Sequence, residues 1–115
     1  MTPQEIAHSL IELRYEQNYL NGILDTLEGV IDLLYGQLDK TGAIWSGNIK
    51  DGDFHLDLVQ DDHMVEATIL MNVAQAVRGD IIKFRELSND NKKHIRRLEK
   101  QKSETIKHKR YRRLG

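Results

Sequence analysis

The 115-residue sequence contains no cysteine, a single proline and no apolar run that approaches the roughly 18 residues of a membrane span. The lack of cysteine excludes disulfide bonds, thiolate zinc sites and thiol nucleophiles, and it fits a reducing compartment. The N-terminus also lacks the basic segment and the apolar segment of a secretion signal. We therefore expect a cytoplasmic protein without a membrane partner, with one modest hydrophobic core.

The sequence also lacks any signature of an enzyme or of a cofactor site. It has no Ser-His-Asp order and no Gly-rich phosphate loop. Glu12 and Glu16 lie one helical turn apart, but they lack the histidine partners that helical metal-dependent enzymes use. The acids and histidines of residues 53–63 are explained better as solvent-facing strand residues and a helix cap than as metal ligands. We therefore predict no catalytic residue, no metal and no cofactor.

A heptad pattern occupies the first third of the chain. From Ile6 to Leu38, isoleucine and leucine residues recur at alternating steps of four and three, and Gln17 is the one polar member of this series. The preceding segment Thr2–Glu5 has the form of a capping box. The pattern predicts a helix that ends near Lys40 and forms a left-handed seam with another helix, either in this chain or in a second copy.

The seam from Ile6 to Leu38 is longer than the only other apolar stripe of the sequence, which runs from Ala67 to Phe84. We therefore expect apolar surface to remain for a second copy, and we favour a dimer. The residues assigned to this oligomer interface are Leu10, Leu13, Gln17, Leu20, Leu24, Leu27, Ile31 and Leu34. Gly22, Gly29 and Gly36 recur every seven residues in the same segment, and each costs about 1 kcal/mol of helix propensity. Close approach of another backbone or tolerance of a slight bend explains them.

Residues 43–59 have the pattern of a β-hairpin. Asp51-Gly52 fits a two-residue type I′ turn, which needs positive φ at both positions. This turn would place Trp45 opposite Leu58. The apolar face of the hairpin would then consist of Trp45, Ile49, Phe54, Leu56 and Leu58. Since two strands alone are only marginally stable, this face should pack on the helices or on a second copy.

A second helix is predicted after Asp61-Asp62, which supply an N-cap and an acidic first turn. Its apolar stripe consists of Ala67, Leu70, Ala74, Val77, Ile81 and Phe84. The low helix propensity of residues 88–91 slightly favours a break there over one continuous helix. The predicted fold class is therefore mainly α, with a long heptad-patterned helix, a short hairpin, and a second helix that continues or breaks into a basic C-terminal helix.

The net charge of −1 conceals two segments of opposite charge. Residues 1–91 hold six Lys/Arg and sixteen Asp/Glu, a net −10, whereas residues 92–115 hold eleven and two, a net +9. We therefore divide the chain into an acidic helical body (1–91) and a basic C-terminal helix or tail (92–115), which we expect to be separable. Such asymmetry is typical of a segment that binds polyanions or a protein partner.

The basic segment predicts binding to the phosphates of nucleic acid, without sequence reading. The residues assigned to this binding, which on a helix would surround its axis, are Lys92, Lys93, Arg96, Arg97, Lys100, Lys107, Lys109, Arg110, Arg112 and Arg113. We predict a non-enzymatic, oligomeric helical protein that binds nucleic acid in this way. The alternatives are a scaffolding or adaptor protein whose tail docks on an acidic protein, an inhibitor whose acidic body occupies a basic partner, and a solvated tail without a partner.

Overall fold

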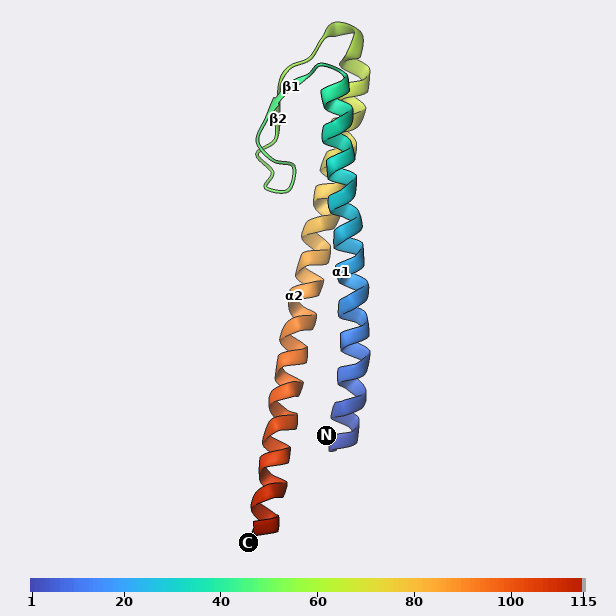
Figure 1. Cartoon of the computed structure of the whole chain (residues 1–115). Helices are drawn as coiled ribbons and strands as arrows, with labels where there is room; N and C mark the ends of the chain where they lie inside the picture. The colour runs from blue at the N-terminus through green and yellow to red at the C-terminus, as the bar shows by residue number, and fades with distance from the viewer. Residues whose placement is uncertain (115) are drawn as a thin grey trace. The chain divides into compact units, whose positions relative to one another are not determined.

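A computed structural model describes the backbone of residues 1–114 and the side chains of residues 1–105. Its elements follow in the order α1 (Pro3–Lys40), β1 (Ile44–Ser46), β2 (His55–Leu58), a short 3-10 helix (Asp61–His63) and α2 (Met64–Leu114) (Figure 1). The two strands form an antiparallel pair. This order confirms the predicted fold class.

Contacts between residues divide the chain into two compact units. Unit 1 combines residues 1–22 with residues 86–115, and unit 2 consists of residues 23–85. Helices α1 and α2 run through both, so each unit contains one segment of each helix. These units are defined by contacts between residues. The predicted division after residue 91 is defined by charge, and the separability of the body (1–91) from the tail (92–115) stays a prediction.

Local chemistry sets the two ends of α1. At its start, the Glu5 N–H donates to Thr2 Oγ1 at 3.2 Å, as a capping box requires. After its last residue, the buried Thr41 hydroxyl donates to the Leu38 carbonyl at 2.7 Å. Gly42 follows with φ +73°, a left-handed conformation that commonly ends a helix. The predicted helix bounds are confirmed.

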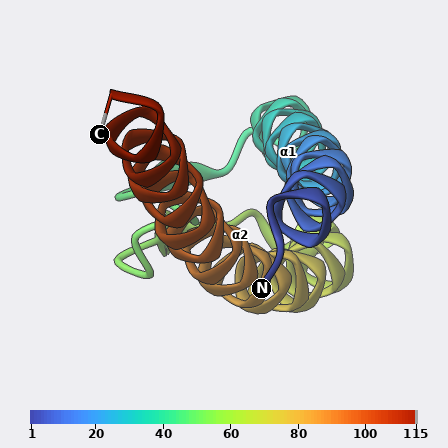
Figure 2. The same ribbon diagram turned by 90° about the horizontal axis from the view of Figure 1, so that it is seen from below.

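The core of unit 2 forms between α1, α2 and the hairpin, which lies on one side of the two helices (Figures 1 and 2). Its buried members are Ile31, Leu34, Ile49, Ala74, Val77 and Ile81. Leu27, Val30, Tyr35, Phe54 and Leu70 pack against it, half-buried. The predicted stripe of the second helix is therefore confirmed at its centre, and the hairpin adds Ile49 from its loop.

The register of the hairpin differs from the predicted one. Trp45 opposes Leu56, and Ser46 opposes His55, with an irregularity between Ile44 and Trp45. The predicted pairing of Trp45 with Leu58 is wrong, because residues 47–54 form a longer loop in place of a two-residue turn.

Backbone conformation explains why the type I′ turn does not form. Among the residues that the structure describes, positive φ occurs only at glycines, so Asp51 lacks the conformation that this turn needs. Instead, the Gly52 N–H donates to the Asn48 carbonyl at 3.1 Å in a helical turn, and the Asn48 N–H donates to Asp53 Oδ1 at 2.7 Å. Gly47 has φ +82°, and a Cβ there would collide with the Asp53 carbonyl. Glycine is therefore required at position 47.

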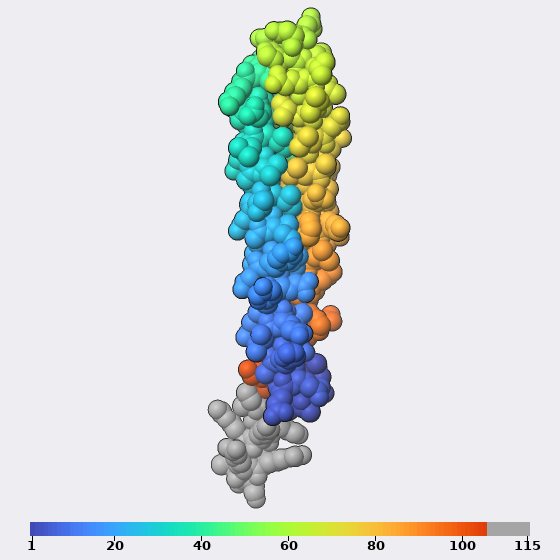
Figure 3. Space-filling view, turned by 90° about the vertical axis from the view of Figure 1, so that its right-hand side faces the viewer, coloured from blue at the N-terminus to red at the C-terminus, as the bar shows by residue number. Residues whose placement is uncertain are grey.

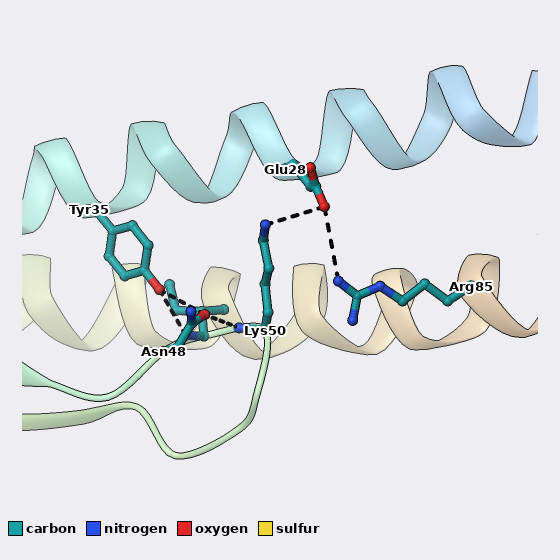
Figure 4. A network of polar contacts seen from close by, with 6 residues as sticks. Glu28, Tyr35, Asn48, Lys50 and Arg85 are labelled. Atoms are coloured by element: carbon teal, nitrogen blue, oxygen red, sulfur yellow. Dashed lines mark hydrogen bonds and ion pairs between the residues drawn. The ribbon is translucent and has the colours of Figure 1, made fainter.

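Aromatic stacking attaches the hairpin to α1. The rings of Tyr35 and Trp45 stack with centroids 4.7 Å apart, and Phe54 lies 5.7 Å from Trp45. The Tyr35 hydroxyl accepts from the Ile49 N–H at 2.9 Å and donates to Asn48 Oδ1 at 3.3 Å (Figure 4). The apolar face predicted for the hairpin is thus confirmed for Trp45, Ile49 and Phe54, whereas Leu58 is 57% exposed and its predicted place on this face is wrong.

In unit 1, helix α2 continues through residues 88–91, so the predicted break is wrong. Ser88 is buried and accepts a hydrogen bond from Gln17 Nε2 at 2.7 Å. Asn91 Nδ2 donates to Gln17 Oε1 at 3.0 Å and to the Leu13 carbonyl at 2.9 Å. We call Gln17, Ser88 and Asn91 the polar layer. Because these side chains bond across the seam, they do not compete for the backbone of α2.

The apolar core of unit 1 is small. Ile6, Leu10 and Leu98 are buried, and Leu13 and Ile95 pack against them. The surfaces of α1 and α2 meet along this seam (Figure 3). Since Leu98 belongs to this core, a cut after residue 91 would remove the partner of the first helical turns.

Candidate nucleic-acid interface

Five basic side chains of α2 lie on one face of the helix. They are Lys92, Lys93, Arg96, Arg97 and Lys100, which we call the cationic face. At about 100° per residue, they fill an arc of about 140°. Ile95 and Leu98, which pack towards α1, lie on the opposite side of the helix. The cationic face therefore points away from α1, and all five residues are exposed.

No residue of the cationic face makes an ion pair with any residue that the structure describes. The nearby carboxylate of Glu99 is engaged elsewhere, since its Oε1 pairs with the Arg14 guanidinium of α1 at 3.0 Å. Glu99 therefore neutralises none of the five cations. Uncompensated charge of this kind is what binds polyanions through counterion release.

Three of these cations form an oblique row along the helix, in which each step turns by about 40°. Lys92, Arg96 and Lys100 are separated by steps of four residues, and at 1.5 Å per residue the row is about 12 Å long. One strand of B-DNA presents about three to four phosphates over that length. The row can therefore contact successive phosphates of a strand lying along the helix. Asp90 and Glu104 border the cationic face and would repel phosphates beyond it.

The other assigned cations lie beyond the described side chains. Those outside are Lys107, Lys109, Arg110, Arg112 and Arg113. The helical period places the five assigned cations of residues 92–100 on one side of α2 and the exposed Lys102 on the opposite side, so the prediction that the basic residues of 92–115 surround the helix axis stays a prediction.

Charge also follows the structural units. Unit 1 holds twelve Lys/Arg and seven Asp/Glu, a net +5, and unit 2 holds five and eleven, a net −6. Of the bases in unit 1, only Arg14 belongs to its α1 segment. The positive charge of unit 1 is therefore concentrated on α2.

The side chains assigned to an oligomer interface pack within the chain. Leu10 and Leu13 belong to the core of unit 1, and Leu27, Ile31 and Leu34 belong to that of unit 2. Gln17 and Leu20 are buried and Leu24 is half-buried. The seam partner is thus the second helix of the same chain, one of the two predicted possibilities. An interface between copies that uses these side chains stays a prediction. It would require α1 and α2 of one chain to separate, because the side chains are packed between them.

Several other candidate side chains serve local structure. Glu28 of α1 contacts Lys50 Nζ at 3.2 Å and the Arg85 guanidinium at 4.0 Å, which connects the hairpin loop to both helices (Figure 4). Asp53 closes the hairpin loop, and His63 Nδ1 lies 3.1 Å from Glu66 Oε2. Among the described residues, no three acidic or histidine side chains converge as a metal site would need.

A small pocket of about 90 Å³ lies in unit 2 between the hairpin loop and α2. It is lined by Ile49, Gly52, Phe54, Met71, Ala74, Gln75 and Arg78. Arg78 Nε is buried and has no hydrogen-bond partner among the described residues. Because that nitrogen is closed off from solvent, a ligand in the pocket cannot reach it.

Sequence reasoning missed an exposed apolar row on α1. Ile11, Tyr15 and Tyr19 are separated by steps of four and, with Glu12 and Glu16, line an open surface groove. The signal was present in the spacing, but the stronger heptad pattern runs through the same segment of the chain.

Within the described residues, neither long helix contains an apolar stretch sufficient to cross a membrane. The chain matches no protein-family model, and it is similar to none of the curated proteins or solved structures with which it was compared. The fold and the site define a two-helix protein with a β-hairpin between its helices and a one-sided cationic face.

Proposed function

We propose that this protein is a non-enzymatic binding protein that holds nucleic acid by its phosphates through the cationic face of α2. The observation that supports the proposal is the set of five exposed cations, without ion pairs, on one side of a helix. Each contact of a Lys or Arg with a phosphate releases condensed counterions, so affinity arises without any reading of the bases. Arg96 and Arg97 can in addition donate two hydrogen bonds to one phosphate.

The test is fluorescence anisotropy with short labelled DNA duplexes of different sequence, titrated between about 50 and 200 mM salt. Five phosphate contacts predict a slope of log affinity against log salt of about −4 to −5. The double variant Lys92→Gln, Arg96→Gln should reduce that slope by about 2 and weaken all duplexes alike.

The matched control is the double variant Lys40→Gln, Lys83→Gln. It removes two exposed positive charges from unit 2, so its net charge equals that of the first variant. Its slope should equal that of the wild type. If the two variants behave alike, or if the wild type fails to bind at the lowest salt, the proposal is wrong.

Assembly of several copies is a second candidate function. The exposed groove around Tyr15 favours it, because contiguous exposed aromatic and apolar side chains are a common feature of protein interfaces.

A further inference from the structure

The exposed side of α1 in unit 1 has the properties of an interface. Ile11, Tyr15 and Tyr19 are 67%, 79% and 66% exposed, and together with Glu12 and Glu16 they form what we call the tyrosine face. By helical period these residues lie on the side of α1 opposite Leu10 and Leu13, which pack in the seam. Contiguous exposed aromatic and apolar surface marks a site of contact with another molecule.

The charge of the tyrosine face selects among possible occupants. Its charged side chains are the carboxylates of Glu12 and Glu16, which repel the phosphates of nucleic acid and of anionic lipids. Glu12 Oε1 lies 3.1 Å from Nε2 of the exposed His8 one turn earlier, and Glu16 makes no ion pair with any residue that the structure describes. Arg14, the one Lys or Arg of this segment, is engaged by Glu99. The occupant that fits is therefore a cationic helix, because cations pair with carboxylates and also bind the faces of tyrosine rings.

The chain itself carries such a helix surface. The row Lys92, Arg96 and Lys100 has the same four-residue spacing and the same length of about 12 Å as the row from Ile11 to Tyr19. We propose that the tyrosine face of one copy docks on the cationic face of a second copy. In this contact Arg96 lies over a tyrosine ring, while Glu12 and Glu16 pair with the flanking cations.

The position of the two faces determines the kind of assembly. Both belong to unit 1, and each points away from the seam between α1 and α2. A copy that offers its cationic face to one neighbour therefore keeps its tyrosine face free for another. Such a head-to-tail contact grows unless it closes into a ring. This self-association does not depend on the proposed function. If the proposed function holds as well, nucleic acid and a second copy compete for the same cationic face.

Sedimentation velocity of the full chain over a range of concentration tests the proposal. The wild type should form species larger than a dimer, and added salt should dissociate them. The variant Tyr15→Ser, Glu16→Gln and the variant Arg96→Gln, Lys100→Gln should each weaken self-association about tenfold or more. Because all four positions are exposed, circular dichroism should show unchanged helix content in both variants.

Mixing the two variants makes the test specific. Each variant retains one intact face, so the mixture should form a one-to-one dimer and nothing larger. Tyr15→Phe, which keeps the ring, should assemble like the wild type, as should Leu33→Ser, which removes an exposed apolar side chain outside the tyrosine face. The proposal is overturned if the wild type stays monomeric at its solubility limit, if the mixture stays monomeric, or if Tyr15→Ser, Glu16→Gln assembles normally.

The same variants separate this proposal from the proposed function. Tyr15→Ser, Glu16→Gln leaves the cationic face intact and should bind DNA with the wild-type salt slope. Failure of the wild type to bind DNA would leave the mixing result unaffected.

Discussion

Units 1 and 2 share the same two helices, yet they are stabilised differently. Unit 2 has a larger apolar core, an aromatic cluster attaching a hairpin, and a net charge of −6. Unit 1 has a smaller apolar core beside the polar layer, and a net charge of +5. Both faces that we propose for binding lie on unit 1. The acidic unit therefore holds most of the buried apolar side chains, whereas the basic unit holds both proposed binding faces.

The largest expected effect is on the core of unit 2. Ile81 is 0% exposed, so Ile81→Ala should lower the free energy of unfolding by about 2–5 kcal/mol in denaturant titrations. Leu33→Ala on the exposed side of α1 is the control, with a change within about 0.5 kcal/mol. Leu98→Ala in unit 1 should cost less than Ile81→Ala, because fewer side chains surround it. If Leu98→Ala lowers the free energy of unfolding as much as Ile81→Ala or more, unit 2 does not have the more stabilising core.

The hairpin loop should give the next largest effect. Gly47→Ala should destabilise the protein by about 2–3 kcal/mol, because alanine resists a φ of +82° and its Cβ would collide with the Asp53 carbonyl. Thermal unfolding followed by Trp45 fluorescence measures the loss, since Trp45 stacks on Tyr35. Ser46→Ala on the adjacent strand should change little. A melting temperature unaltered by Gly47→Ala would contradict the loop conformation.

The polar layer, which belongs to unit 1, should respond in opposite directions to a single and a triple substitution. Gln17→Leu should cost about 1–2 kcal/mol, because it leaves the buried Ser88 hydroxyl without the Gln17 amide and removes one of the two hydrogen bonds of the half-buried Asn91 amide. Changing all three together, with Ser88→Ala and Asn91→Leu, should restore stability or raise it. Denaturant titrations of the single and triple variants provide the measurement. If the triple variant is less stable than Gln17→Leu alone, the hydrogen bonds contribute more than the apolar contacts that replace them.

The smallest expected effect is a gain in stability on substitution of Gly29 in α1. No atom outside the helix backbone lies within 4 Å of a Cβ built at Gly29, so no backbone approaches this glycine closely within the described chain. Gly29→Ala should therefore stabilise the protein by about 0.5–1 kcal/mol through helix propensity. A loss of stability would indicate a partner that approaches α1 at this position, and concentration-dependent unfolding would then identify a second copy.

Local patterns predicted most of the fold. The capping box and the heptads set the bounds of α1, and the stripe around Ala74 identified the buried side of α2. The two errors have physical causes beyond local sequence. The turn failed because Asp51 does not adopt positive φ. The break failed because the partner of Ser88 is Gln17, 71 residues away.

The candidate site was predicted in composition but not in geometry. A count of Lys and Arg identifies the basic segment, whereas its one-sided placement follows from the helical period at Lys92, Arg96 and Lys100. That Glu99 does not neutralise the cationic face depends on a long-range pair, since its carboxylate is engaged by Arg14. No local pattern reveals that pair.

The order in which contacts connect the chain has a consequence for synthesis on the ribosome. In unit 2, Tyr35 and Ile49 bond across only 14 residues, so this contact can form soon after both emerge. In unit 1, the pair of Arg14 with Glu99 can form only after 85 further residues have been synthesised. Ile6 and Leu10 likewise cannot be buried before Leu98 has been synthesised. At about 5–20 residues per second, the first helical turns stay without their partner for on the order of 4–17 s. Among these contacts, the apolar side chains of residues 6–10 therefore stay exposed longest during translation.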